Sequence, residues 1–505
     1  MAGEGPPRLE SSGPPDGSAS LSERRQALER WRAEGVDPFG GSLRPTHHTR
    51  EIRDGFDALE GAAVVLAGRL MAVRRQGRAA FADVQDRDGR LQIFARRDRM
   101  GEEGFARFGR CEVGDLVAAA GTVMRTRAGE PSVEADRVEL LAKALRPLPD
   151  KWHGLRDPEV RHRRRYLDLI ANPPAKDLLL LRSRLVSFIR RFLDERGFIE
   201  VETPVLHTVA SGAEARPFVT HHNALGTDLH LRIALELHLK RLIVGGLERV
   251  YEIGRVFRNE GVSTRHNPEF TMLECYQAYA DYTDMMRLTE DLVTGAAREL
   301  LGTTAVRWRG RDIELAAPWP RVSIADGLAA RGLDLLGAAG DAEAAARARA
   351  AGLDVPEGAT LGQAVEAAVD RLLMPDLVGP TFLIDHPVAV SPLARARRDA
   401  PHLAERFEWI VAGTEMANAF SELNDPDEQR RRFAQQAAER ARGNDEAQAL
   451  DADFLRALEH GMPPTGGLGL GVDRLAMLLG GAESIRDVIV FPHLRPDPPE
   501  AADAP

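Results

Sequence analysis

The sequence contains few cysteines and no long apolar segment. Only Cys111 and Cys275 occur among its 505 residues, which excludes a disulfide framework and a zinc site made of cysteines alone, and suits a reducing cytosol. No uninterrupted apolar run is long enough to span a bilayer, and the first 20 residues lack the apolar core of a secretory signal. We therefore expect a cytoplasmic protein without a membrane segment.

A large excess of positive charge is also missing. The 67 Lys and Arg residues are outnumbered by 77 Asp and Glu residues, giving a formal net charge of -10. This balance argues against a protein that coats nucleic acid non-specifically, but it allows a local basic face to bind RNA. Hydrophobic residues make up 43% and charged residues 29%, as in globular proteins. A chain of this length is expected to form two or three cores.

Short strands dominate the first third of the chain. After a tail rich in Gly, Pro and Ser at 1–20, residues 21–60 predict a helical extension, because apolar residues recur there at helical spacing. Five short apolar runs follow within 61–143, and two of them are joined by an Asp-Arg-Asp-Gly turn. This series is typical of a five-stranded OB-type β-barrel, whose open face binds oligonucleotides.

The remainder of the sequence predicts a linker and one large domain. The linker, 144–177, contains the basic run 161–165, which is either a solvated charged face or a contact for phosphates. Residues 178–495 alternate helix and strand patterns without an internal repeat. Within them, the Ala-rich stretch at about 323–370 carries no chemical motif and is interpreted as a helical insertion. A second solvated tail is expected at 496–505.

A first motif in the large domain fits a nucleotide. Arg258, at the end of one strand pattern, suits bidentate binding of a phosphate, and Phe270, on the returning strand, offers a flat face for a purine. Turn residues at Gly254 and 259–261 are expected to separate the two strands. The alternative is a surface hairpin with an ordinary salt bridge.

A second motif is the glycine-rich segment 467–474. Glycines at alternate positions let a strand backbone approach a ligand closely. Arg474 then stands at a helix start, where its guanidinium can meet phosphate or stack on a base. The segment matches neither the dinucleotide fingerprint nor the P-loop, so it is weak support when taken alone.

A third motif is acidic. Glu408 and Glu415 lie on either side of a short turn at 412–413. A hairpin there brings both carboxylates toward one Mg²⁺ ion, which prefers oxygen ligands and shared phosphate oxygens. Exposed acidic residues are common in hairpins, so a site without a metal is the alternative.

Together the three motifs resemble those of class II aminoacyl-tRNA synthetases, and the resemblance covers about residues 21–496. The helix-strand unit that ends at Pro204 is similar to their first motif, which forms a dimer interface. Residues 257–270 resemble the second motif and 467–474 the third. The resemblance implies an α+β fold in which an antiparallel sheet is flanked by helices, following an N-terminal OB-type barrel. It also implies a homodimer.

Within this class, the subgroup with an N-terminal barrel serves aspartate, asparagine and lysine, and residues 232–241 and 271–276 resemble the lysyl enzymes. Carboxylates, rather than arginines, would suit an ammonium group. Three carboxylates around one small site repel each other unless a cation is bound, and bound lysine would be that cation. The implied lysine-binding residues are Gly212, Glu236, Glu274, Tyr276, Asn418 and Glu422.

For ATP, the resemblance implies that Arg258 holds the α-phosphate and the attacking carboxylate, while Glu260 binds the adenine amino group. Phe270 and Arg474 would sandwich the ring, and His266 would meet the pyrophosphate. The implied reaction is in-line attack of the lysine carboxylate on the α-phosphorus with release of pyrophosphate, assisted by Mg²⁺. The aminoacyl group would then pass to the 3′ end of tRNA(Lys).

In the barrel, Phe81, Gln92 and Glu130 occupy positions at which relatives bind anticodon bases. Phe81 in a strand also fits a core position. Arg78 and Pro131 depart from the usual residues of the family, Lys and Leu, near the same face.

Three other functions remain open at this point. A lysyl transferase that modifies protein would resemble the large domain alone, so the barrel counts against it. A non-catalytic RNA-binding relative is disfavoured by intact Arg258, Glu408, Glu415 and Arg474. An aspartyl or asparaginyl enzyme is disfavoured by the carboxylates at the pocket positions.

Overall fold

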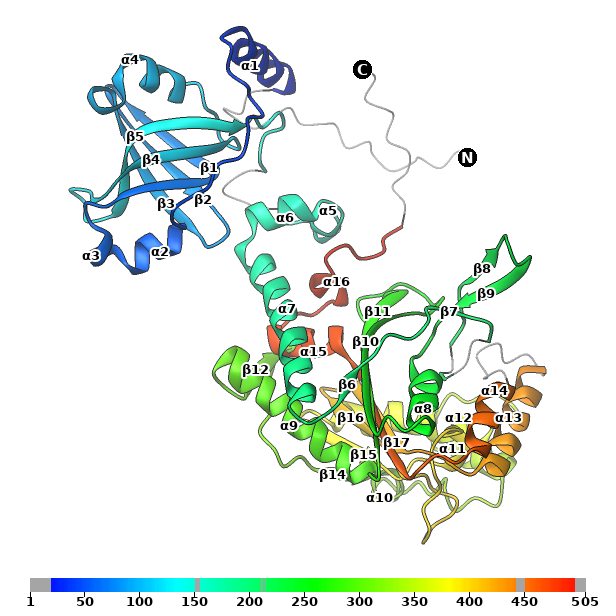
Figure 1. The fold of residues 1–505 in the computed structure, drawn as a ribbon. Coiled ribbons are helices and arrows are strands. Elements are labelled where there is room, and N and C mark those ends of the chain that lie inside the picture. Colours follow the sequence, from blue (N-terminus) through cyan, green and yellow to red (C-terminus); the bar gives the residue numbers. More distant parts are fainter. Residues whose placement is uncertain (1–19, 150–154, 210–211, 214, 442–449, 496–505) are drawn as a thin grey trace, which may run out of the picture. The chain divides into compact units, whose positions relative to one another are not determined.

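The computed structural model describes residues 20–149, 155–209, 212–213, 215–441 and 450–495. The chain divides into two compact units, 1–156 and 157–505, each described here by itself (Figure 1). The tails expected at 1–20 and 496–505 lie outside the described residues except for Ser20. Ser20 caps the first helix through a capping box with Glu23, which satisfies backbone donors at that helix end.

The first unit is a closed five-stranded barrel with neighbouring strands in the order β1-β2-β3-β5-β4, so the predicted OB-type barrel is confirmed. All pairs are antiparallel except β3 and β5. The strands are β1 (Ala63–Gln76), β2 (Ala79–Gln85), β3 (Arg90–Arg96), β4 (Leu116–Arg125) and β5 (Pro131–Ala142). The helices are α1 (Leu21–Ala33), α2 (Thr49–Asp54), α3 (Phe56–Leu59) and α4 (Arg97–Phe108).

Alternation along the strands builds the barrel core. In β2, Ala80, Ala82 and Val84 are each 1% exposed, while the residues between them face outward. Close strand approach requires glycine at Gly121, because a Cβ there would overlap the carbonyl oxygen of Glu134 where the β4–β5 register shifts.

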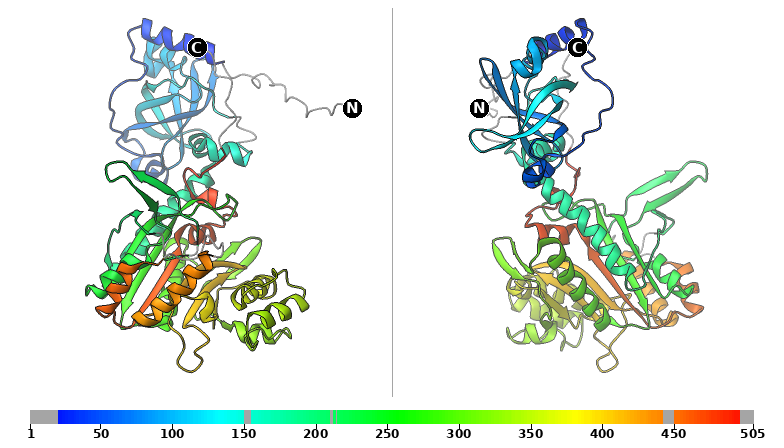
Figure 2. Two further views of the ribbon diagram at one scale, coloured as in Figure 1. Left: turned by 90° about the vertical axis from the view of Figure 1, so that its right-hand side faces the viewer. Right: turned by 60° about the vertical axis from the view of Figure 1, so that its left-hand side comes forward.

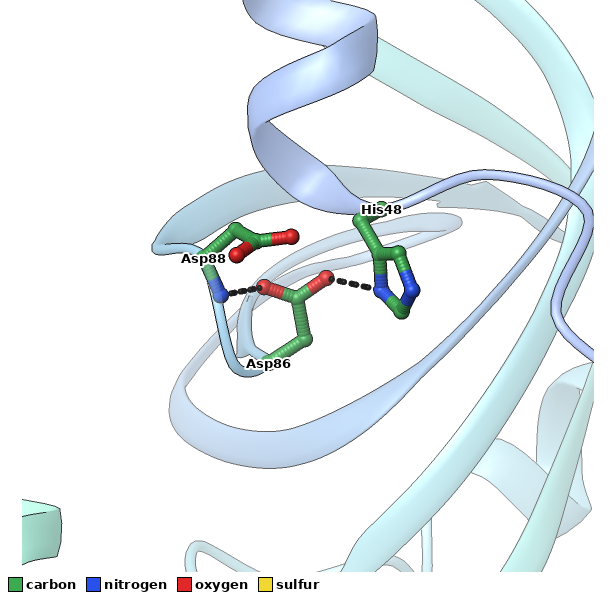
Figure 3. Close-up of side chains that lie close together, drawn as sticks. All are labelled: His48, Asp86 and Asp88. Atoms are coloured by element: carbon green, nitrogen blue, oxygen red, sulfur yellow. Dashed lines mark hydrogen bonds and ion pairs between the residues drawn. The ribbon is translucent and has the colours of Figure 1, made fainter. Parts of the chain in front are cut away.

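A polar cluster of His48, Asp86 and Asp88 joins α2 to the β2–β3 turn (Figure 3). The Asp86 carboxylate accepts hydrogen bonds from the backbone and hydroxyl of Thr49 and from the Asp88 and Gly89 amides. Burial raises the pKa of Asp86, but these hydrogen bonds outweigh it and leave that pKa lowered. The cluster therefore acts as a structural link between helix and hairpin.

Replacing Asp86 with Ala should destabilise the barrel by about 1–3 kcal/mol, because several donors lose one shared acceptor. Calorimetric unfolding of the full chain would show a lower transition temperature for the barrel. Asp88→Ala is the matched control, because among the described residues the side chain of Asp88 pairs with its exposed neighbour Arg87. If the barrel unfolds at the same temperature in both variants, Asp86 is not the structural link between helix and hairpin.

The second unit is built on an eight-stranded sheet with the order β14-β15-β16-β17-β18-β11-β10-β6. Within the described part of this sheet, only the pairs β14–β15 and β10–β6 are parallel, so the predicted antiparallel sheet is confirmed. Its strands are β6 (Ile199–Glu200), β10 (Arg249–Phe257), β11 (Glu269–Ala278), β14 (Arg321–Ser323), β15 (Thr381–Ile384), β16 (Arg406–Val411), β17 (Thr414–Ser421) and β18 (Thr465–Gly471). Smaller sheets contain β7 (Leu206–His207), β8 (Val219–His222), β9 (Thr227–Leu231), β12 (Ala305–Trp308) and β13 (Arg311–Glu314).

Helices cover both faces of this sheet, as Figures 1 and 2 show. On one face α7 (Pro173–Asp194), α9 (Tyr282–Leu301) and α15 (Val472–Gly480) share a core with Leu468 and Leu470 of β18. On the other face α8 (Glu236–Val244), α13 (Pro426–Ala441) and α14 (Ala452–Glu459) form a second core with β10 and β11. A cavity remains on this second face.

The Ala-rich stretch is helical and has its own core. It contains α10 (Ile324–Ala329), α11 (Asp341–Ala350), α12 (Leu361–Ala368), η1 (Val369–Leu373) and η2 (Met374–Asp376). Buried alanines such as Ala344 and Ala348 let α11 and α12 approach closely. A further short helix is η3 (Val388–Val390). None of the described helices combines the length and apolar character that crossing a bilayer requires.

The basic run 161–165 is mainly structural. It spans α5 (Pro158–Arg163) and the start of α6 (Arg165–Ala171). Arg165 is 1% exposed and donates to carbonyl oxygens of residues 486, 489 and 490, the region of α16 (Ile485–Val488), while His162 pairs with Asp487. For these side chains neither the solvated face nor the phosphate contact is correct, since they bind the protein's own C-terminal segment.

Candidate functional site

A cavity of about 420 Å³ lies on the sheet face opposite α7 and α9. It is polar at both ends and has an apolar wall that includes Met272 and Leu393. The predicted site residues that line it are Gly212, Glu236, Arg258, Glu260, His266, Phe270, Glu274, Tyr276, Asn418, Glu415, Glu422 and Arg474. Residues from β11, β17, α8, α15 and the loops beside them thus meet in one space.

Alternating glycines form the floor of this cavity. In the sheet, Gly467 pairs with Tyr276 on β11 and with Phe420 on β17, and Gly469 pairs with Glu274 and Asn418. Directly paired residues share a face of the sheet. Because glycine has no side chain, Gly467 and Gly469 leave room between the side chains of β11 and those of β17. The leucines between the glycines point into the core below. The pattern seen in the sequence is therefore a strand with one empty face.

The first end of the cavity is cationic. Arg258 follows β10, and its guanidinium lies 5.3 Å from the centre of the Phe270 ring. Its Nε donates to the Ile233 carbonyl at 3.4 Å. Burial lowers the pKa of Arg258, opposed by nearby carboxylates that include Glu260. The Arg258 side chain thus lines the cavity and contacts the Phe270 ring and the Ile233 carbonyl.

The loop between β10 and β11 carries two more of the predicted nucleotide-binding residues, Glu260 and His266. Both are exposed. His266 Nδ1 lies 3.1 Å from Ser263 Oγ, and burial, followed by Arg474, lowers the pKa of His266. Gly254 was expected in a turn here. It lies instead within β10 opposite Met272, because the strand continues to Phe257 and the turn begins beyond it.

Two carboxylates lie on the neighbouring hairpin. Glu408 is on β16 and Glu415 on β17, joined by the turn at Ala412 and Gly413. Burial and the like charge of Glu408 raise the pKa of Glu415. Arg474 Nη1 donates to the Glu415 carbonyl at 2.6 Å and lies 3.6 Å from its carboxylate. Glu408 pairs with Arg406 at 2.8 Å and is not among the cavity-lining residues.

The second end of the cavity is acidic. Glu236 begins α8, Glu274 lies on β11, and Glu422 follows β17; each is 6% exposed or less. Glu274 accepts hydrogen bonds from the Leu235 amide and the Tyr276 hydroxyl, both at 3.0 Å. Burial and the neighbouring Glu236 raise the pKa of Glu274 to about 7. This end is suited to a cation.

Sequence reasoning missed a cation inside this acidic end. Lys240 is fully buried and its ammonium contacts both Glu236 and Glu422. The expectation that only a bound substrate would relieve the repulsion of three carboxylates is therefore wrong, because one internal charge is already present. The i, i+4 spacing of Glu236 and Lys240 on a helix was a visible signal.

Arg406 was also missed, and its position 12 residues before Asn418 gave no signal. Its Nε donates to Asn418 Oδ1 at 3.0 Å, and its other nitrogens reach Glu408 and the Val390 carbonyl. It therefore links Asn418 to Glu408. Gly212, with φ of +92°, is packed so that a Cβ would lie 3.2 Å from the Ala234 Cβ, consistent with a tight loop over the cavity.

In the barrel, two of the three predicted RNA-facing residues, Phe81 and Gln92, lie on the adjacent strands β2 and β3. Phe81 stacks on Phe94 with ring centres 4.7 Å apart and is only partly buried, so it belongs to the outer face rather than the core. Gln92 is 7% exposed and its Oε1 accepts from Ser132 Oγ at 3.2 Å. Glu130 is exposed in the β4–β5 turn.

Comparison with known families agrees with both units. Residues 157–495 match the tRNA synthetases class II (D, K and N), and residues 64–141 match the OB-fold nucleic acid binding domain. The larger match spans most of the chain and contains the whole cavity. The fold and the site thus define the catalytic unit as a class II tRNA synthetase.

Sequence identity to individual proteins narrows the family further. Lysine–tRNA ligase of Moorella thermoacetica is 53% identical over 94% of this chain and 98% of its own length. The ligases of Carboxydothermus hydrogenoformans and of a Roseiflexus species are 51% and 54% identical, again over 94% of this chain, and over 97% and 99% of their own lengths. The chain belongs to the lysine–tRNA ligase family.

Proposed function

We propose that this protein activates L-lysine with ATP and transfers it to tRNA(Lys). The observation that carries the proposal is the polarity of the cavity, which has arginines at one end and three carboxylates at the other. Triphosphate requires cations, and the lysine ammonium requires carboxylates. A single space with both ends can hold the two substrates with their reacting groups in between.

For the nucleotide, Arg258 would bind the α-phosphate and orient the attacking carboxylate. Phe270 and Arg474 would hold the adenine between them, with Glu260 at its amino group and His266 at the pyrophosphate. The carboxylate attacks the α-phosphorus as the bond to pyrophosphate breaks, so the reaction needs charge stabilisation and alignment rather than a protein nucleophile. Arg258 would supply that stabilisation from the position that the Phe270 ring and the Ile233 carbonyl give it.

Glu408 and Glu415 would hold Mg²⁺, which neutralises phosphate charge when bound. The donor set fits, because both groups are carboxylates on paired strands, and burial together with the like charge of Glu408 raises the pKa of Glu415. Two carboxylates do not fill a magnesium shell, so phosphate oxygens would complete it.

For lysine, Glu274 and Tyr276 form the wall, Glu236 and Glu422 the acidic end, and Asn418 a neutral acceptor. Gly212 would present backbone over the bound amino acid. In the barrel, Phe81 and Gln92 would stack on and pair with anticodon bases, with Glu130 at the edge.

A homodimer is part of the proposal. Apolar side chains exposed in the region expected to dimerise are Leu180 on α7, Ile199 on β6, and Val205 and Leu206 beyond it, and covering them favours association. Two buried free cysteines are compatible with a cytoplasmic location.

The function is tested by ATP–pyrophosphate exchange with each of the twenty amino acids. Lysine alone should support exchange well above background, and the same preparation should then charge tRNA(Lys) rather than label protein. Exchange driven by aspartate or asparagine, or the absence of exchange with every amino acid, would refute the proposal.

The KM for lysine should rise as pH falls below 7. Glu274 has a raised pKa of about 7, so its ionised form, which attracts the ammonium, is lost below that pH. At pH 6 about a tenth of the ionised form remains, so we expect a roughly tenfold higher KM. Exchange kinetics from pH 6 to 8.5 would measure it, with the KM for ATP as internal control. A flat lysine KM would contradict the role of Glu274.

A further inference from the structure

Lys240 is an unusual residue in this chain. The sequence holds only four lysines, at 143, 151, 176 and 240, among 67 basic residues. Lys240 is 0% exposed, and its Nζ lies between Glu236 on its own helix and Glu422 beyond β17. The rings of Phe420 and Phe454 lie 5.4 and 5.9 Å from the same atom. Arginine dominates elsewhere, so the use of lysine here points to a need for one compact charge.

The two carboxylates that Lys240 contacts belong to the proposed lysine pocket. Glu236 and Glu422 line the cavity proposed for the substrate ammonium. Glu422 Oε2 contacts the Lys240 ammonium, and Glu422 Oε1 has no hydrogen-bond partner among the described residues. A buried carboxylate with an unpaired oxygen is costly to ionise. Lys240 is the cation that contacts both of them, so their charge and orientation depend on it.

We propose that Lys240 is a positioning residue that acts as a built-in counter-cation, holding Glu236 and Glu422 charged and oriented so that they can receive the ammonium of the substrate. The inference rests on the proposed function, because it concerns the same pocket. With Lys240 present, three carboxylates face one internal cation, and a substrate monocation still meets an excess of negative charge. Without Lys240, the carboxyls would retain protons and attract that monocation less.

The groups around Glu236 and Glu422 determine how the loss of Lys240 changes the pH dependence of lysine binding. The charged and titratable groups that face the pair are Glu274 and Tyr276, both from β11. Burial raises the pKa of Glu422, and Lys240 opposes that rise. Removing Lys240 should therefore raise the Glu422 pKa further, and lysine binding should recover only at higher pH.

The test compares Lys240→Met with Lys143→Met. Lys143 is the matched control, since it is also fully buried and contacts two carboxylates, Glu112 and Asp115, but in the barrel unit. In pyrophosphate exchange, K240M should raise the KM for lysine at least about tenfold at pH 7 and only about threefold at pH 8.5, with the KM for ATP within about twofold. K143M should leave both constants unchanged.

A purely structural role gives a different result. It predicts a loss in K240M that is equal at both pH values or shared by ATP, and either outcome would overturn the inference. Lys240→Arg keeps the charge, so it should keep the pH dependence of the wild type even if affinity falls. An Arg variant with the pH dependence of K240M would also refute the proposal.

If the Lys240 variants fail to fold, a measurement on the wild-type protein still tests the proposal. With protein labelled at lysine Cε and freed of lysine, only four side-chain signals are expected, and K143M, K151R and K176R assign three of them. The fourth should keep the shift of an ammonium beyond pH 10.5 and should move when unlabelled lysine is added. A neutral amine signal at pH 8, or no response to lysine, would exclude the counter-cation. If wild type shows no lysine-dependent exchange at all, the proposed function fails instead.

Discussion

Replacing Arg258 with Lys is expected to lower kcat/KM for lysine-dependent pyrophosphate exchange about 10²–10³-fold, mostly in kcat. Lysine keeps the charge but lacks the planar fork that binds two oxygens at once, and transition-state donors in fixed positions are worth that much. The side chain is already aligned by the Phe270 ring and the Ile233 carbonyl, so a shorter-reaching ammonium would lose that alignment.

Arg255→Lys provides the control for this variant. Arg255 lies three residues earlier, on β10, is exposed, and pairs with Glu269 across the surface at 3.4 Å. Surface pairs of this kind contribute little, so R255K should retain activity within about twofold. An R258K enzyme with more than a third of wild-type kcat/KM would remove Arg258 from the reacting centre.

Replacing Gly467 with Ala should raise the KM for lysine about 10- to 100-fold. A Cβ at this position would overlap Glu422 Oε1 and lie 2.5 Å from Tyr276 Cε1, so two pocket side chains would have to move. Overpacking of this kind costs about 1–3 kcal/mol, which corresponds to the stated change in affinity. The KM for ATP should change much less, because the arginines lie at the other end of the cavity.

Gly469→Ala is the matched control on the same strand. The nearest atom to its added Cβ is the flexible Met272 Cε at 3.4 Å, an ordinary contact that can relax. Lysine kinetics of G469A should therefore change less than those of G467A, because no pocket side chain has to move. If the two alanine variants behave alike, the lysine pocket does not lie above Gly467.

Much of the fold follows from local patterns. The barrel strands and their turn, the helix from Leu21 and the glycine-rich strand leading into Arg474 were all predictable, because alternation and turn residues act over a few positions. Gly254 was misplaced because a glycine inside a strand resembles one in a turn when the sheet partner is unknown. The partners of the basic run 161–165 could not be foreseen, since they lie more than 300 residues away.

The sequence by itself determined which motifs exist, which family they resemble and which residue types could bind ATP, magnesium and lysine. Only the tertiary structure decided that β18 lies between β11 and β17, so that glycines 467 and 469 open a cavity between Glu274 and Asn418. It also decided that Lys240 meets Glu422, which is 182 positions away. Strand order and burial join distant residues through packing and desolvation, and neither acts over the short spacing that a sequence pattern reports.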